Sequence, residues 1–171
     1  YSYGVVYVQR IDRAGIPQWQ ADGIALTSSV KSFLSDVAIC SDNHGGAILC
    51  WANSTDVTMY AQRVDSAGVI RWTPGGLALG SAGSGGGQRI TADGSGGAFI
   101  GHGKYIQHVD SNGIKRWSPQ GVQYTTLQTV ESTQAPSPGG GIWNFWKNFI
   151  DGIGFRIYGQ WIDGTGRTRW G

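Results

Sequence analysis

The sequence has little charge, few cysteines and no long apolar run. Charged residues make up 14% of its 171 residues, and the formal net charge is +2 with histidine neutral, whereas globular chains average about 25% charged residues. The basic residues are scattered apart from Arg167 and Arg169, so the chain lacks the basic patch of a nucleic-acid-binding protein. No apolar run approaches the roughly 18 residues that span a bilayer. We therefore expect neither nucleic-acid binding nor membrane insertion.

The sequence also lacks any sustained helical periodicity. Glycine is abundant at 29 residues, which disfavours helices, and the 8 tryptophans and 7 tyrosines are side chains that suit strands. The high aromatic content argues against disorder, and the glycines do not follow the three-residue period that collagen requires. These observations predict an all-β chain that forms one domain or a segment of one.

A repeat of one motif dominates the sequence. Four copies follow the template Y-x-Q-x-[VI]-D-x-x-G-x-x-x-W, and the first three carry a further glycine four residues after the tryptophan. The steps from one template tryptophan to the next are 53, 45 and 53 residues. The template residues are Tyr7, Asp12, Gly15 and Trp19 in the first copy, Tyr60, Asp65, Gly68 and Trp72 in the second, Tyr105, Asp110, Gly113 and Trp117 in the third, and Tyr158, Asp163, Gly166 and Trp170 in the fourth.

A second glycine-centred motif lies between these copies. Ser41–Trp51 aligns with Ala92–His102, and less well with Ser137–Trp146, and each pattern predicts a strand, a turn and a strand. One full unit therefore holds four antiparallel strands, called A to D here, in two hairpins. Four such strands in 45 to 53 residues match the size of a β-propeller blade. A sandwich of stacked hairpins is the alternative.

The repeat boundaries predict about three and a half blades, which form one propeller domain or a segment of one. Residues 1–28 form a half blade with strands C and D, 29–80 and 81–126 form complete blades, and 127–171 form a blade truncated at its end. Closed propellers typically have about four to eight blades. We therefore expect the remaining blades to come from a longer chain or from other copies that complete a ring. Because Tyr1 opens within a repeat, we expect a mature product or an excised segment.

The template predicts one structural turn in each copy. The aspartates Asp12, Asp65, Asp110 and Asp163 are expected to accept hydrogen bonds from turn amides, and the glycine three residues later to supply a positive φ. Each template tryptophan is expected to pack between neighbouring blades. Calcium is the alternative partner of the aspartates, but it takes about six or more oxygen ligands. A turn such as 65–68 offers one carboxylate, so we expect no metal and no cofactor.

The run Tyr60–Trp72 carries a family resemblance. Its sequence, Y-A-Q-R-V-D-S-A-G-V-I-R-W, resembles repeats of large secreted and cell-surface bacterial proteins that are predicted to form β-propellers. The D-x-x-G-x-x-x-W element is also similar to the Asp-box of sialidase-type propellers, although it has one more residue before the glycine and one more before the tryptophan. The resemblance covers nearly the whole chain and implies a secreted, repeat-built surface or adhesion module. It carries over no catalytic residue.

The residues do not predict an active site. Sialidase-type enzymes use three arginines, a tyrosine nucleophile and acidic partners, but most arginines here occupy or adjoin repeated positions, as Arg10 and Arg63 do. The histidines lack metal-ligand spacing, and neither a G-x-S-x-G nor a P-loop motif is present. We therefore predict a non-enzymatic extracellular or cell-surface propeller module with a structural or adhesive recognition role. A carbohydrate-binding propeller lectin is the alternative, and a sialidase-like glycoside hydrolase is the third candidate.

Three aromatic residues at the ends of the B strands form the predicted ligand site. Trp51, His102 and Trp146 align, and the next template tyrosine follows 9, 3 and 12 residues later, so the B–C loop carries most of the length variation. Loops on a rigid scaffold commonly carry function, and these rings would suit glycans or peptide side chains. The alternative is that they pack between blades. We expect Trp72 and Trp117 to be buried, and Trp51 and Trp146 to be more exposed.

The longest B–C loop, 147–157, is the predicted contact site for another chain or for missing blades. Its large apolar residues include Phe149, Ile150, Ile153 and Phe155. Adjacent large apolar residues in a loop are rarely left uncovered. We therefore expect this loop to form an interface.

Cys40 and Cys50 flank the A–B turn of one blade. Both are replaced at the aligned positions of the next blade, where Thr91 and Gly101 stand. An extracellular location permits a cross-strand disulfide between them. The alternative is that they are small buried apolar residues.

Overall fold

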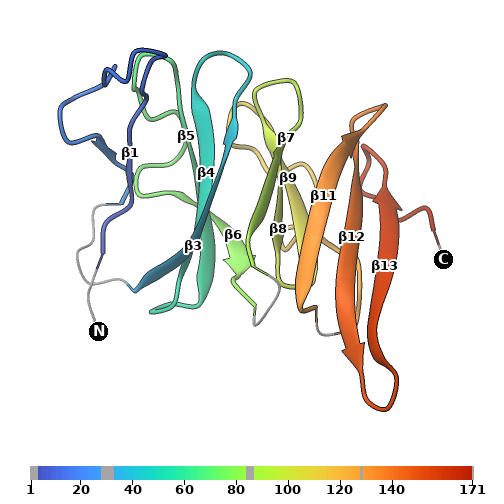
Figure 1. The fold of residues 1–171 in the computed structure, drawn as a ribbon. Coiled ribbons are helices and arrows are strands. Elements are labelled where there is room, and N and C mark those ends of the chain that lie inside the picture. The colour runs from blue at the N-terminus through green and yellow to red at the C-terminus, as the bar shows by residue number, and fades with distance from the viewer. Residues whose placement is uncertain (1–3, 28–32, 84–86, 128, 171) are drawn as a thin grey trace.

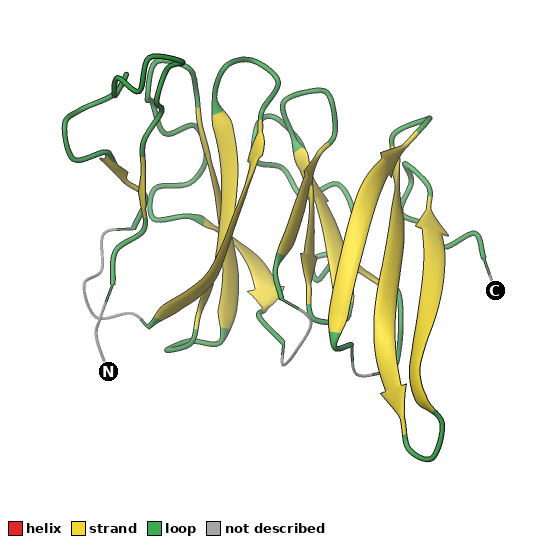
Figure 2. Ribbon diagram, viewed as in Figure 1, coloured by secondary structure: helices red, strands yellow, loops and turns green. Residues whose placement is uncertain are grey.

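The computed structural model describes residues 4–27, 33–83, 87–127 and 129–170. Within these residues the chain forms thirteen strands in four antiparallel sheets and no helix, which confirms the all-β prediction (Figure 1, Figure 2). The first sheet contains β1 (Tyr7–Val8) and β2 (Ile24–Ala25), the second β3 (Leu34–Ser41), β4 (Ala47–Asn53), β5 (Thr58–Val64) and β6 (Leu77–Ser81), the third β7 (Arg89–Ala92), β8 (Ala98–His102), β9 (Tyr105–Val109) and β10 (Val122–Gln123), and the fourth β11 (Glu131–Ser137), β12 (Gly141–Ile150) and β13 (Gly154–Ile162).

Each sheet is a meander of strands that follow one another in the sequence. The four sheets lie side by side in chain order, and the fourth is nearest the C-terminus (Figure 1). The first strands of the last three sheets contact one another in turn, β3 with β7 and β7 with β11. The strands that the repeat assigns as A therefore form one row, and the later strands of each sheet follow outward from it.

The core consists of three apolar layers, one between each pair of neighbouring sheets. Successive side chains of a strand point to opposite faces. On β4, Leu49 and Trp51 therefore pack with the first sheet, whereas Ile48 and Cys50 pack with the third. The second and third sheets are thus covered on both faces. The layer between the third and fourth sheets contains Phe99, Ile106, Trp117, Tyr124, Ile142, Trp146 and Ile162.

The template tryptophans join neighbouring sheets. The Nε1 of Trp72 donates to the carbonyl of Ser111 at 3.2 Å, and a Cβ at Gly113 would lie only 2.9 Å from the Trp72 ring. The turn glycine is therefore needed for the tryptophan of the preceding sheet to approach. Trp72 and Trp117 are both buried, as predicted. The other two junctions repeat this arrangement, with Trp19 on Ser66 and Gly68, and Trp117 on Gly164 and Gly166.

The template aspartates close their turns as predicted. The Oδ1 of Asp65 accepts hydrogen bonds from the backbone amides of Ala67 and Val69, both at 2.9 Å, and the φ of Gly68 is +82°. The Val69 amide and the Arg71 side chain hold the pKa of Asp65 below its ordinary value. The same pairs of turn amides bind the carboxylates of Asp12, Asp110 and Asp163.

A second polar contact ties each A–B turn to strand C. In the second sheet, the Nη2 of Arg63 lies 2.9 Å from the Oδ2 of Asp42, and the Asp42 side chain is buried. Burial alone would raise the pKa of Asp42, but the hydrogen bonds from the His44 amide and from Arg63 outweigh it and lower that pKa. The equivalent contacts join His108 to Asp93 in the third sheet and Trp161 to Ser137 in the fourth.

Of the two alternatives left open for the cysteines, the disulfide is not formed, and both Cys40 and Cys50 are free thiols. The register pairs Cys50 with Ala38 and Cys40 with Ile48, so the two cysteines are not directly opposite each other. Cys50 lies in the layer between the second and third sheets, and Cys40 packs against that layer. Burial raises the pKa of both thiols to about 12. They therefore stay protonated at neutral pH and serve as small apolar residues.

Candidate functional site

The three residues predicted to bind a ligand are buried. Trp51, His102 and Trp146 are 1%, 1% and 6% exposed, so the expectation that Trp51 and Trp146 are the more exposed tryptophans is wrong. Each is the cross-strand partner of a template tyrosine, so the three positions are equivalent, as their alignment indicated. They are buried because strand alternation points them into the layer shared with the preceding sheet.

The contacts of these side chains show that they belong to the core. Trp51 stacks on Tyr60 with 6.1 Å between ring centroids, and the ring edge fills the space beside Gly76. The Nδ1 of His102 lies 2.9 Å from the carbonyl of Ser81. Burial lowers the pKa of His102, so its imidazole is neutral at pH 7. None of these groups presents a surface to a ligand.

The B–C connection of the fourth sheet is an extended hairpin rather than a long loop. β12 continues to Ile150, β13 begins at Gly154, and Phe149 pairs directly with Phe155. The predicted length variation between strands B and C is therefore present, but as additional strand. Phe149, Ile153 and Phe155 are exposed, and Ile150 is half-buried. The end of the hairpin thus presents apolar side chains to solvent.

This hairpin is part of a larger exposed surface on the fourth sheet. Ile142 and Trp146 of β12 pack against the third sheet, so Trp143 and Phe145, which alternate with them along the strand, point to the opposite side. The register sets these outward residues beside those of β13, and Trp143 pairs with Trp161. We call this surface the outer aromatic face. It consists of Trp143, Phe145, Phe149, Phe155, Ile157, Trp161 and Trp170.

Trp170 lies on the outer aromatic face instead of joining a following sheet. Its ring centroid is 4.8 Å from that of Trp143 and 6.4 Å from that of Phe145, and the side chain is 43% exposed. Gly159 provides the space for this arrangement, because a Cβ there would lie 2.7 Å from the Phe145 ring and 3.3 Å from the Trp170 ring. The fourth copy of the template therefore ends in an exposed aromatic cluster.

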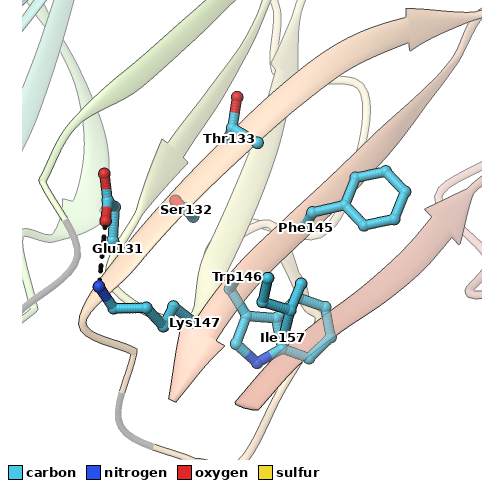
Figure 3. A pocket seen from close by; sticks show the side chains of 7 residues that line it. All are labelled: Glu131, Ser132, Thr133, Phe145, Trp146, Lys147 and Ile157. Atoms are coloured by element: carbon cyan, nitrogen blue, oxygen red, sulfur yellow. Dashed lines mark ion pairs between the residues drawn. The ribbon is translucent and has the colours of Figure 1, made fainter. Parts of the chain in front are cut away.

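A pocket lies beside these rings, with Phe145 and Ile157 in its lining (Figure 3). The Nζ of Lys147 lies 3.6 Å from the Oε2 of Glu131 and 4.5 Å from the centre of the Phe155 ring. An exposed ion pair of this kind contributes little stability. It does place one charge of each sign next to apolar rings, which suits a ligand with both apolar and polar groups.

Trp143, Phe145 and Trp170 were not among the ligand-binding or interface residues predicted from the sequence. The signal was present in β12, where Trp143 and Phe145 occupy the positions that Ile48 and Cys50 occupy in the second sheet. Ile48 and Cys50 are fully buried against a following sheet, whereas the outward residues of β12 are at least partly exposed. Locating the site therefore required knowing which face of each strand the next sheet covers.

Neither a cluster of metal ligands nor a membrane-spanning helix is found in the described part of the chain. No group of three histidine, cysteine, aspartate or glutamate side chains is arranged there to hold a metal ion. Nor is any helix in those residues long and apolar enough to cross a membrane. Comparison of the chain with protein-family models, curated proteins and solved structures finds no match. The fold and the outer aromatic face are therefore the basis for a proposed function.

Proposed function

We propose that the chain is a β-propeller module of an extracellular or cell-surface protein, with a structural and adhesive recognition role and no enzymatic activity. The observation that carries the recognition role is the outer aromatic face. Exposed aromatic clusters of this kind are rare on isolated soluble domains and mark surfaces that bind another molecule. Aromatic side chains are also enriched at protein interfaces.

The propeller architecture is supported by the row of A strands and by the repeated junctions. β3, β7 and β11 contact one another in turn, as the innermost strands of radially arranged blades do. A sandwich has one core between two sheets, whereas the second and third sheets here each contribute to two apolar layers. The stacked-hairpin sandwich is therefore the weaker alternative.

The contacts of the acidic and histidine side chains support the part of this proposal that assigns no enzymatic activity. Asp42 is held by Arg63, and Asp93 is held by His108. The buried imidazole of His102 faces a backbone carbonyl. These groups stabilise the sheets, and the outer aromatic face offers contact area instead of acid–base chemistry.

Carbohydrate binding is the alternative function, and the pocket beside Phe145 favours it. Aromatic rings present flat apolar faces that can stack on sugar rings. Glu131, Thr133 and Lys147 also line this pocket and supply acceptors and donors for hydroxyl groups (Figure 3).

A glycan array with the labelled chain separates the two functions. We expect no glycan to bind, even at millimolar sugar in a follow-up titration. Glycan binding that is retained by Val69→Ala, a change of an exposed apolar residue in the connection between β5 and β6, and lost in Phe145→Ala would replace our proposal by the lectin. Antibody labelling of intact source cells tests the location, and a signal seen only after permeabilisation would contradict it.

A further inference from the structure

The three junctions between sheets follow one rule of contact. In each, a template tryptophan covers the turn glycine of the following sheet. Its Nε1 also donates to the carbonyl of the residue after the turn aspartate. A junction therefore needs a tryptophan from one sheet and a D-x-x-G turn from the next. The acceptor carbonyls in the three junctions are those of Ser66, Ser111 and Gly164.

The fourth sheet supplies a junction tryptophan, Trp170, but no turn of a following sheet lies against it among the described residues. Trp170 is 43% exposed, and its Nε1 has no hydrogen-bond partner among the described residues. Trp143 beside it takes the strand position of Phe99, which is fully buried against the following sheet. The surface around Trp170 thus has the composition of a sheet face that a neighbour covers.

The first sheet supplies the matching D-x-x-G turn, but among the described residues no tryptophan of a preceding sheet covers it. The Oδ1 of Asp12 accepts the amides of Ala14 and Ile16 at 2.8 and 2.9 Å, and the φ of Gly15 is +81°. This turn therefore has the geometry of the other three. A Cβ at Gly15 would meet nothing within 4 Å, and no described residue donates to the carbonyl of Arg13, which follows Asp12.

The exposure of Ile11 is independent evidence that this side of the first sheet can pack against another sheet. Val64, Val109 and Ile162 hold the same template position, and all three are 0% exposed in the layer shared with the preceding sheet. Ile11 is 61% exposed. The first sheet thus exposes an apolar residue at a position that is buried at every junction within the chain.

We propose that the outer aromatic face binds the first sheet of a second copy of this chain, with Trp170 covering Gly15 and donating its Nε1 hydrogen to the Arg13 carbonyl. Ile11 is then buried against the fourth sheet, as Ile162 is against the third. A second copy is the occupant because the vacant turn that matches Trp170 lies on this same chain. The contact is head-to-tail, so its repetition gives a ring or an open array. This inference rests on the proposed propeller architecture.

Two variants that each remove one half of the junction test the proposal. Trp170→Ala removes the tryptophan and Ile11→Ser weakens the receiving surface. Both positions are exposed, so both variants should fold, which circular dichroism checks. Ile114→Ser is the matched control, because Ile114 is an exposed apolar residue of an interior turn. Sedimentation and light scattering over the micromolar range report the state of association.

We expect the wild type and Ile114→Ser to form dimers or larger assemblies. Each end variant alone should associate about tenfold or more weakly, as loss of a central tryptophan contact does at other interfaces. An equimolar mixture of the two end variants should form a dimer, because Trp170→Ala keeps an intact turn and Ile11→Ser keeps an intact tryptophan. This rescue distinguishes a head-to-tail contact from non-specific aggregation.

Three outcomes would overturn the proposal. A wild type that stays monomeric would show that a second copy is not the occupant. Full association of Ile11→Ser alone would instead indicate symmetric pairing of two outer aromatic faces. A mixture that stays monomeric would rule out the head-to-tail contact. None of these outcomes bears on the junctions within the chain, whose contribution is measured separately by the unfolding of Trp117→Ala.

Discussion

The interior sheets and the two ends of the stack use the same template with different results. Trp72 and Trp117 are buried against the turn of a following sheet, whereas Trp170 lies exposed on its own sheet. At the opposite end, Gly15 keeps its positive φ although no ring covers it. The turn geometry is therefore the same with and without a neighbour. The template specifies a self-contained turn and, separately, a surface for an adjacent sheet.

Replacing an interior tryptophan is the most severe way to test this comparison. We expect Trp117→Ala to lower the free energy of unfolding by about 3–5 kcal/mol, because it leaves a cavity between the third and fourth sheets. Trp170→Ala removes the same template residue at the exposed end and should cost less than about 1 kcal/mol in the monomer. Urea unfolding followed by circular dichroism measures both. Equal losses would show that the two tryptophans are not in different environments.

The A–B turn contacts offer a second comparison of an interior sheet with the end sheet. Asp42→Asn keeps the shape of the turn but leaves Arg63 without its carboxylate. We expect a loss of about 2–3 kcal/mol, below the figure for a fully buried pair because Arg63 retains some solvent contact. Ser137→Ala removes one neutral hydrogen bond from Trp161 and should cost about 1 kcal/mol. A larger loss for Ser137→Ala would contradict this order.

The same pair of variants has a pH signature. The folded pKa of Asp42 lies below its ordinary value of about 3.9. Its stabilising contribution is therefore present above that pH and is lost as the pH falls through the lowered folded pKa. Stability measured on descent below about pH 4 should fall less steeply in Asp42→Asn than in the wild type. Ser137→Ala should retain the wild-type slope.

The last comparison uses two glycines with the same backbone conformation. Gly113 and Gly15 have φ values of +80° and +81°, so alanine at either position costs about 1 kcal/mol for the left-handed conformation. At Gly113 the new Cβ would also lie 2.9 Å from the Trp72 ring, whereas at Gly15 it would meet nothing. We expect Gly113→Ala to cost about 1–2 kcal/mol more than Gly15→Ala. Thermal unfolding of both variants measures the difference, and equal losses would mean that the ring does not constrain the turn.

The turns and the hairpins were predictable from the sequence because their determinants are local. The D-x-x-G spacing sets the aspartate two and four residues from the amides that it binds, as Asp65 shows. Strand pairing then follows from the short connections between strands. The burial of Trp72 and Trp117 was predictable for a related reason, because a large residue repeated at the same place in each unit packs in the same way wherever a following sheet covers it.

The exposure of individual aromatic residues was not predictable in this way. Burial of Trp51 and exposure of Phe145 both depend on which face of strand B an adjacent sheet covers, and the spacing of the repeat does not state this. The choice between a disulfide and two buried thiols was not predictable for a related reason. The β3–β4 turn is centred on His44, because Ser41 pairs with Ala47. Cys40 and Cys50 are centred one residue further along, which offsets them by two positions across the hairpin.

The independence of the Asp12 turn from any neighbour has a consequence for how such a chain can change its length. A unit that completes its own turn and carries both halves of a junction can be duplicated in a gene without redesign of the units beside it, since each unit interacts mainly with its nearest neighbours. The hairpin between strands B and C lies away from the junction turn, so it can lengthen in one copy and shorten in the next. Recombination between copies, rather than point substitution, is then the natural route by which the number of sheets varies.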